Sequence, residues 1–157
     1  MKNPLIYIID QSNSYRVLLQ NNLAAIQLEN LKAFQSIEEC LDFGGKPDII
    51  ILDDQQANEG MSGIDFLRIY QSRYKRSEFL FLSSNTNLDD AVSAIKLGAS
   101  EYIVKSKVGL KRLIKRIDKL VKSKALDQRK KKLLRAAVLC LGTFSFILAV
   151  AIILYIN

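Results

Sequence analysis

The sequence predicts an α/β domain with a doubly wound, five-stranded parallel sheet, followed by one C-terminal transmembrane helix. Two observations support the sheet: short apolar runs alternate with stretches of helical periodicity through residues 1–107, and three runs are apolar at almost every position. Strands covered by helices on both faces have this composition, and strict alternation of strand and helix favours parallel pairing. A third observation predicts the added helix, since residues 136–156 contain no charged side chain.

Five short apolar runs are the predicted strands: Leu5–Ile9, Leu31–Phe34, Ile49–Leu52, Phe79–Leu82 and Tyr102–Val104. Between them, helical periodicity predicts helices over residues 13–27, 36–43, 62–74 and 87–97. Ser36 with Glu39, and Ser62 with Asp65, have the spacing of a hydroxyl and an acid that cap a helix start. Gly98 follows the fourth helix, where a left-handed residue commonly ends a helix.

The last third of the chain is predicted to be helical and basic before it becomes apolar. Residues 108–126 place apolar side chains at helical spacing, with Lys and Arg on the other face. The 21 residues of 136–156 would span roughly 30 Å as a helix, which matches a bilayer core. We therefore expect three parts: a domain over 1–124, a basic juxtamembrane segment over 125–135 and a transmembrane helix over 136–156.

Positive residues precede the apolar run and set its expected orientation. These residues are Arg129, Lys130, Lys131, Lys132 and Arg135. The positive-inside rule then predicts a single-pass protein of the cytoplasmic (inner) membrane with its N-terminal domain in the cytoplasm. Membrane lipid is an expected partner of this basic segment.

Charge is distributed unevenly along the chain. Residues 1–104 carry 9 Lys and Arg against 14 Asp and Glu, whereas the rest carries 14 against 2, which gives +7 in all. No recognition-helix pattern accompanies the basic part, so we expect no nucleic-acid partner. With no His and two distant Cys, the composition also argues against a zinc site.

Polar side chains stand where the predicted strands end. They are Asp10, the pair Asp53 and Asp54, the pair Ser83 and Ser84, and Lys105. In a doubly wound sheet the functional crevice lies at the carboxyl ends of the strands, so these groups should converge. Carboxylates suit Mg²⁺, while a lysine and a hydroxyl suit phosphate oxygens. The pattern therefore favours phosphoryl transfer to a carboxylate.

Four segments in order make residues 4–122 resemble the receiver domain of two-component response regulators, a flavodoxin-like fold. IYIID ends at Asp10, and PDIIILD ends at Asp53, which selects Asp53 over Asp54 as the phosphoacceptor. FLSS contains Ser83, and GASEYIVK ends at Lys105, 22 positions after Ser83.

The resemblance implies a role for each matched residue. Asp53 would accept a phosphoryl group from a histidine kinase or phosphotransfer protein, with Ser83, Lys105 and Tyr102 as the phosphate-binding and switch residues. Mg²⁺ would be the cofactor, held by Asp10, Asp53 and the backbone of Gln55, with Gln11 a weaker ligand. Enzymatic activity would be limited to self-phosphorylation and autodephosphorylation at Asp53. Signalling would proceed by contact with a protein target, and a homodimer is a further expectation.

Three departures from the family pattern leave a second hypothesis open. Gln11 stands where the family has a second acid, and a neutral amide is a poorer Mg²⁺ ligand than a carboxylate. Gly63 lies ten residues after Asp53 instead of eight, and Ser106 replaces a cis-proline, so a trans bond is expected after Lys105. The alternative is a pseudo-receiver that is not efficiently phosphorylated and acts as a constitutive docking module at the membrane.

Overall fold

The computed structural model describes residues 3–54, 60–73, 77–84 and 88–156, without the side chains of Arg73, Gln128 and residues 144–156. The chain divides into two compact units, Lys2–Asp118 and Lys119–Asn157. The first unit contains the sheet and the second contains most of the last helix.

Strands and helices alternate as the sequence predicts. The strands are β1 (Ile6–Ile9), β2 (Leu31–Phe34), β3 (Ile49–Asp53), β4 (Glu78–Ser83) and β5 (Glu101–Val104). The helices are α1 (Asn13–Ala24), α2 (Ile37–Phe43), α3 (Gly63–Arg73), α4 (Leu88–Lys96) and α5 (Lys107–Ile156). Each predicted strand overlaps an observed one, and every strand boundary agrees to within one residue.

All five strands pair in parallel, in the order β2-β1-β3-β4-β5. The chain moves outward from β1 to β2 and then returns to place β3 on the other side of β1. The order therefore reverses between β1 and β3, which is where doubly wound sheets form their binding crevice. Ile9 pairs with Leu52, so Asp10 and Asp53 follow at the same level on neighbouring strands.

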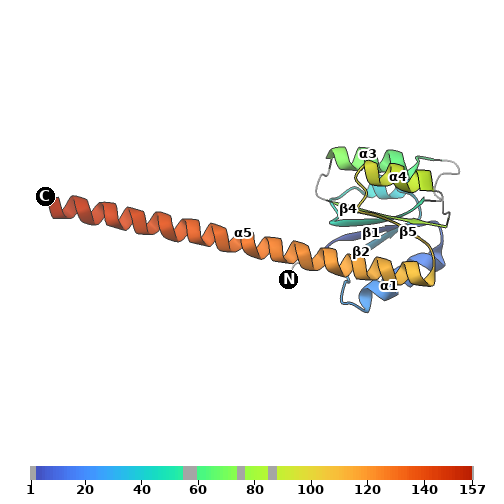
Figure 1. Ribbon diagram of the computed structural model, residues 1–157, viewed down its shortest axis with the longest axis horizontal. Coiled ribbons are helices and arrows are strands. Elements are labelled where there is room, and N and C mark those ends of the chain that lie inside the picture. Colours follow the sequence, from blue (N-terminus) through green and yellow to red (C-terminus); the bar gives the residue numbers. More distant parts are fainter. Residues whose placement is uncertain (1–2, 55–59, 74–76, 85–87, 157) are drawn as a thin grey trace. The chain divides into compact units, whose positions relative to one another are not determined.

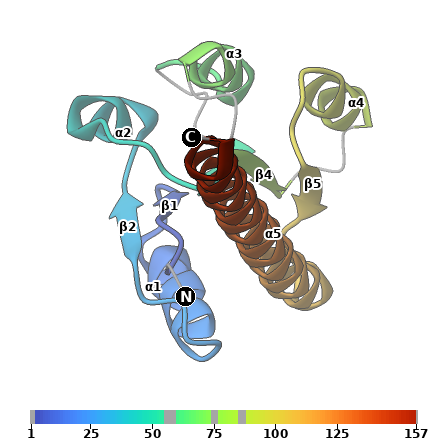
Figure 2. The same ribbon diagram turned by 90° about the vertical axis from the view of Figure 1, so that its left-hand side faces the viewer.

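Helices cover both faces of the sheet. Figure 2 shows α2, α3 and α4 on one face and α1 on the other, and Figure 1 shows the beginning of α5 beside α1. Leu19 and Leu23 of α1 and Leu113 and Ile117 of α5 are fully buried. Because both faces are covered, β1, β3 and β4 are buried almost throughout, which explains their nearly continuous apolar composition.

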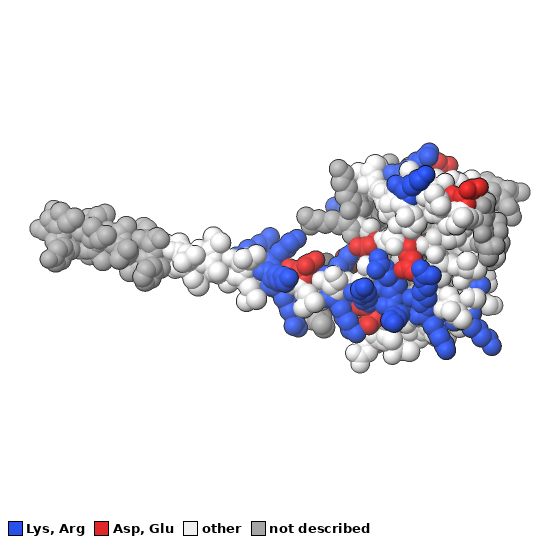
Figure 3. Space-filling view, viewed as in Figure 1, with Lys and Arg blue, Asp and Glu red and all other residues white. Residues whose placement is uncertain are grey.

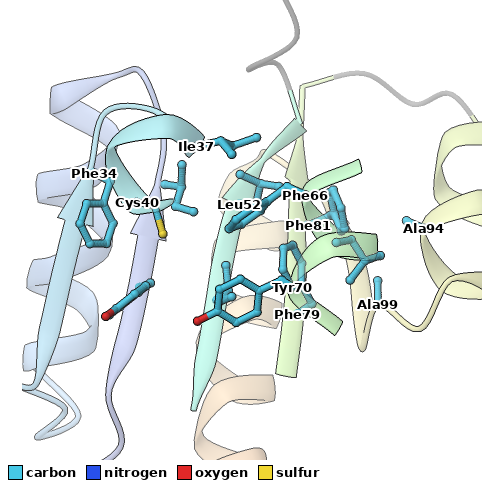
Figure 4. Close-up of a cluster of buried hydrophobic side chains, with 14 residues drawn as sticks. Phe34, Ile37, Cys40, Leu52, Phe66, Tyr70, Phe79, Phe81, Ala94 and Ala99 are labelled. Carbon is cyan, nitrogen blue, oxygen red and sulfur yellow. The ribbon is translucent and has the colours of Figure 1, made fainter. Parts of the chain in front are cut away.

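Aromatic side chains dominate the core beneath α2, α3 and α4 (Figure 4). Phe66 and Tyr70 of α3 pack against Phe79 of β4, with ring centroids 5.5 and 6.4 Å from that of Phe79. Phe81 continues the row toward the carboxyl ends of the strands, 5.3 Å from Phe79. This packing fixes the strand ends that carry the polar groups.

Helix α5 is one continuous helix over Lys107–Ile156, whereas the sequence predicted separate helices over 108–126 and 136–156. The connecting residues are good helix formers and include neither Gly nor Pro, so nothing in them ends a helix. In the part of the chain that the structure describes, no helix is long and apolar enough to cross a membrane. Much of the predicted span, residues 144–156, lies outside the part of the chain whose side chains the structure describes.

Candidate functional site

The polar residues at the strand ends converge as the sequence predicts. Asp10 follows β1, Asp53 ends β3, Ser83 ends β4 and Lys105 follows β5. Three of them are buried, with exposed fractions of 1% for Asp10, 5% for Asp53 and 0% for Ser83. Burial of two carboxylates at one edge of the sheet requires compensation by a cation or hydrogen bonds.

Lys105 provides that compensation. Its Nζ lies 2.8 Å from Asp10 Oδ2 and 2.7 Å from Asp53 Oδ2, so one ammonium bridges both carboxylates. The backbone N–H of Lys105 donates to the Ser83 carbonyl at 2.7 Å, which ties the end of β5 to β4. The lysine is therefore fixed at its backbone and at its charged end.

Two opposing effects act on the pKa of Lys105. Burial lowers it, because a charged group is disfavoured away from water. Hydrogen bonds to Asp10 and Asp53 and the charges of both carboxylates raise it, and together they leave the pKa above its ordinary value. The ammonium thus stays charged through the physiological range.

The start of α1 orients Asp10. The backbone N–H of Ser12 donates to Asp10 Oδ1 at 2.8 Å, while Oδ2 faces Lys105. Arg16 donates to the carbonyl oxygens of Asp10 and Gln11 and holds the turn between β1 and α1. Both oxygens of the Asp10 carboxylate are consequently fixed.

The adjacent carboxylates of Asp53 and Asp54, at the end of β3, have different partners. Asp53 faces Lys105, whereas Asp54 Oδ2 accepts a hydrogen bond from the Tyr102 hydroxyl at 2.7 Å. Successive side chains of a strand point to opposite faces, which explains why the two separate.

Tyr102 connects this edge of the sheet to the core. Its ring stacks on Phe81 at 6.0 Å between centroids. Burial and the interactions with Asp54 raise the pKa of Tyr102 to about 12, against a hydrogen bond to Ser83 that lowers it. Tyr102 therefore contacts two of the residues at the strand ends through its hydroxyl.

Ser106 caps the helix that follows the site. Its Oγ accepts a hydrogen bond from the backbone N–H of Gly109 at 2.9 Å, and its carbonyl accepts from Leu110. The structure has no cis peptide bond among its described residues, so the bond after Lys105 is trans, as predicted. A serine at this position thus begins α5 directly.

Asp10 and Asp53 are the side chains at this edge of the sheet that could bind magnesium. Among the described residues, no three side chains of His, Cys, Asp or Glu lie together in a way that could hold a metal ion, so a site made only of protein side chains is not present there. Asp10 and Asp53 supply two carboxylates, and Mg²⁺ commonly binds to one or two carboxylates while keeping several waters. The two carboxylates therefore fit a hydrated magnesium ion.

The other predicted ligands add little to that set. Gln11 is exposed, and its carbonyl accepts from Arg16. Gln55 lies outside the described residues. The structure thus brings together Asp10, Asp53, Ser83, Lys105 and Tyr102, but does not bring Gln11 into the buried part of the site.

Tyr15 is a residue of this site that the sequence analysis missed. It lies in the first turn of α1, and Lys105 Nζ stands 4.6 Å from the centroid of its ring. The available signal was its position in the first turn of the helix that begins just after Asp10.

The predicted orientation residues lie in the second unit. Arg129, Lys130, Lys131, Lys132 and Arg135 are all exposed on α5. Figure 3 shows Lys and Arg side chains gathered along this helix. Within the first unit, exposed basic residues of the same helix include Lys107, Lys111, Arg112 and Lys115.

Comparison with protein families matches residues 6–118 to the response regulator receiver domain. Among curated proteins, the DNA-binding transcriptional regulator NtrC of Klebsiella pneumoniae is 29% identical over 107 residues, which is 67% of this chain and 22% of that protein. The putative response regulator NtrX-like of Rickettsia felis is 30% identical over 101 residues, 64% of this chain and 21% of that protein. The chain therefore matches about a fifth of the length of these relatives.

Solved structures share the fold. The signal receiver domain of a putative LuxO repressor protein from Vibrio parahaemolyticus has a TM-score of 0.69 at 21% identity, covering 80% of this chain and 95% of that one. NtrX from Brucella abortus, solved in complex with ATP, has a TM-score of 0.70 at 20% identity, covering 83% of this chain and 30% of NtrX.

Proposed function

Since the chain belongs to the response regulator receiver family, we propose that it accepts a phosphoryl group on Asp53 from a histidine kinase or phosphotransfer protein. Lys105 is the observation that carries this proposal, because its ammonium bridges Asp10 and Asp53 within 2.8 Å of each. Receiver domains generally bind Mg²⁺ at such an acidic site and are generally not enzymes in their own right. Asp10 and Asp53 are the residues that would hold the ion here, where it neutralises charge during transfer.

Asp53 acts as the nucleophile in this proposal. One of its carboxylate oxygens forms a bond to phosphorus as the bond from phosphorus to the donor's imidazole nitrogen breaks, and the imidazole leaves neutral or takes a proton from water. Lys105 then pairs with the phosphoryl oxygens, since its ammonium already lies beside the acceptor oxygen. Ser83 and Tyr102 respond to the new charge, because the Tyr102 hydroxyl interacts with Ser83 and Asp54.

Gln11 supports the alternative of a pseudo-receiver. An exposed neutral amide at this position leaves two carboxylates for a divalent cation. Weak cation binding would slow phosphorylation, and the domain would then stay unphosphorylated and act as a constitutive docking module.

Beryllofluoride is a mimic of the phosphoryl group, and its binding in the presence of Mg²⁺ distinguishes a phosphorylated receiver from a pseudo-receiver. We expect saturable binding to the full chain that Asp53→Asn abolishes and Asp54→Asn preserves. The matched control removes the same charge from the adjacent residue, whose carboxylate faces Tyr102. Absence of binding to the unmodified chain at millimolar Mg²⁺ would favour the pseudo-receiver.

The exposed face of α4 supports signalling by protein contact. Leu88, Val92 and Ile95 are exposed by 73%, 41% and 48%. Beside them, Glu101 of β5 pairs with Arg112 and Arg116 of α5. An apolar strip with paired charges at its edge suits a protein target or a second copy of the chain. Val92→Glu and Ile95→Glu together should weaken such contacts in cross-linking while leaving the domain folded.

A membrane location is part of the same proposal, in which residues 136–156 anchor the chain to the cytoplasmic membrane. Its support is the uncharged sequence of 136–156 and the basic residues of 129–135 before it. In membrane fractions, alkaline carbonate should not extract the full chain. It should extract a double variant that carries Ile147→Arg and Ala151→Arg, since each added charge in a membrane span costs about 3 kcal/mol. The control Leu126→Arg adds a charge before the span and should stay bound to the membrane.

A further inference from the structure

The start of α1 places Tyr15 over Lys105. Ser12 is the N-cap of the helix, and its Oγ accepts a hydrogen bond from the Tyr15 backbone N–H at 3.3 Å. The ring then covers the Lys105 ammonium, 4.6 Å from its centroid. A cation at this distance from an aromatic face is attracted to it, so Tyr15 helps to hold Lys105 between Asp10 and Asp53.

The hydroxyl of Tyr15 is buried and lacks a hydrogen-bond partner among the described residues. Most buried polar groups in proteins are paired, and leaving one unpaired costs about 1–3 kcal/mol. The contact of the ring with Lys105 does not use the hydroxyl, so phenylalanine would make this contact equally well. The unpaired hydroxyl therefore points to an acceptor that arrives at the site.

The surroundings indicate which kind of acceptor fits. Burial raises the pKa of Tyr15, and Lys105, Asp10 and Asp53 lie near enough for their charges to act on it as well. The phenol thus stays protonated and able to donate through the physiological range. A phosphoryl group on Asp53 would bring three anionic oxygens close to the Tyr15 hydroxyl. A hydroxyl forms a short, strong hydrogen bond with such an oxygen.

We propose that the Tyr15 hydroxyl donates a hydrogen bond to the phosphoryl group on Asp53, while its ring holds the Lys105 ammonium beside that group. The inference rests on the proposed function, in which Asp53 is the acceptor. It adds a contact from α1 to a site otherwise built from the ends of the strands.

Binding of beryllofluoride at fixed Mg²⁺ to the full chain in detergent micelles tests the proposal. Tyr15→Phe removes the hydroxyl and keeps the ring. We expect its affinity for beryllofluoride to fall about tenfold or more, as for loss of a hydrogen bond to a charged group. Its resistance to urea without the mimic should be unchanged or higher, because the lost hydroxyl has no partner there.

Tyr70→Phe is the matched control. Its hydroxyl donates to the Gly45 carbonyl at 3.3 Å, away from the site. This variant should bind beryllofluoride as the unmodified chain does and should lose some resistance to urea. In carbon-13 spectra of ring-labelled tyrosines, the signal missing from Tyr15→Phe should shift in the unmodified chain when beryllofluoride is added.

Two results would overturn the inference, and they differ in meaning. If Tyr15→Phe binds as tightly as the unmodified chain, the hydroxyl has only water as its partner and Asp53 keeps its proposed role. If the unmodified chain does not bind beryllofluoride at all, the proposed function fails and the inference fails with it.

Discussion

Lys105 Nζ lies 2.7 Å from Asp53 Oδ2, which places the ammonium of Lys105 against the proposed phosphoacceptor. The same ammonium contacts Asp10, so its removal leaves two buried carboxylates on neighbouring strands without their shared cation. Because both carboxylates are buried, loss of the ammonium should change the free energy of unfolding enough to measure.

Lys105→Met should lower the free energy of unfolding by about 3–5 kcal/mol at neutral pH, as expected when one partner of a buried ion pair is lost. Added Mg²⁺ should restore part of this loss, because a cation between the carboxylates replaces the missing charge. Urea unfolding with and without Mg²⁺ measures both effects. Lys107→Met, at an exposed position on α5, should change little, and an equal loss in both variants would contradict this view of the site.

Tyr102 should make the protein sensitive to high pH. Its pKa is raised to about 12 in the folded state, mainly by burial, from an ordinary value of 10. A group whose folded pKa is raised stabilises the fold fully below its unfolded pKa and loses that contribution as pH rises through the folded value. The contribution of Tyr102 should therefore disappear between pH 10 and 12.

Urea unfolding across this pH range, with Tyr102→Phe for comparison, measures the effect. The variant should lose less stability than the unmodified chain over the same range. At neutral pH it should be less stable by about 1.5 kcal/mol, since the hydrogen bond to Asp54 is gone. Identical alkaline curves would show that Tyr102 titrates as it does in the unfolded chain.

Gly109 should tolerate no side chain. A Cβ added there would collide with the Val104 carbonyl oxygen, at the point where β5 leads into α5. Gly109→Ala should therefore destabilise the domain by about 1–3 kcal/mol, despite the higher helix propensity of alanine. Gly142→Ala, in the same helix with open space around it, should not destabilise the chain in thermal unfolding.

Gln11→Asp should strengthen Mg²⁺ binding. A unit negative charge about 4 Å from a divalent cation contributes roughly 2 kcal/mol even at the dielectric constant of water, which corresponds to more than tenfold in affinity. Calorimetric titration measures the change, and Gln20→Asp on α1 supplies the same charge away from the strand ends. Equal affinities in these two variants would show that position 11 does not face the cation.

Much of this site could be predicted from the sequence, because its residues follow directly from the strand pattern. Once β1, β3, β4 and β5 are placed in parallel, Asp10, Asp53, Ser83 and Lys105 must fall at the same edge. The separation of Asp54 from Asp53 also follows, since side chains alternate along a strand.

Contacts that depend on packing could not be predicted in this way. Tyr15 reaches Lys105 only because α1 packs with one particular face toward the end of β5, and a pattern of apolar residues does not fix that geometry. The hydrogen bond from Tyr102 to Asp54 likewise depends on a choice of rotamer. The continuity of α5 was missed because the basic residues of 125–135 were interpreted as a separate segment between two helices, although a change in composition alone does not end a helix.

The central claim, that Asp53 accepts a phosphoryl group, is tested most directly by chemical trapping. The full chain is incubated with Mg²⁺ and a small phosphoryl donor such as acetyl phosphate, and borohydride then reduces any aspartyl phosphate to homoserine. We expect peptide mass spectrometry to find homoserine at position 53 and not at 54, in the unmodified chain and in Asp54→Asn. If homoserine appears only in Gln11→Asp and never in the unmodified chain, the claim is contradicted and the protein is a pseudo-receiver.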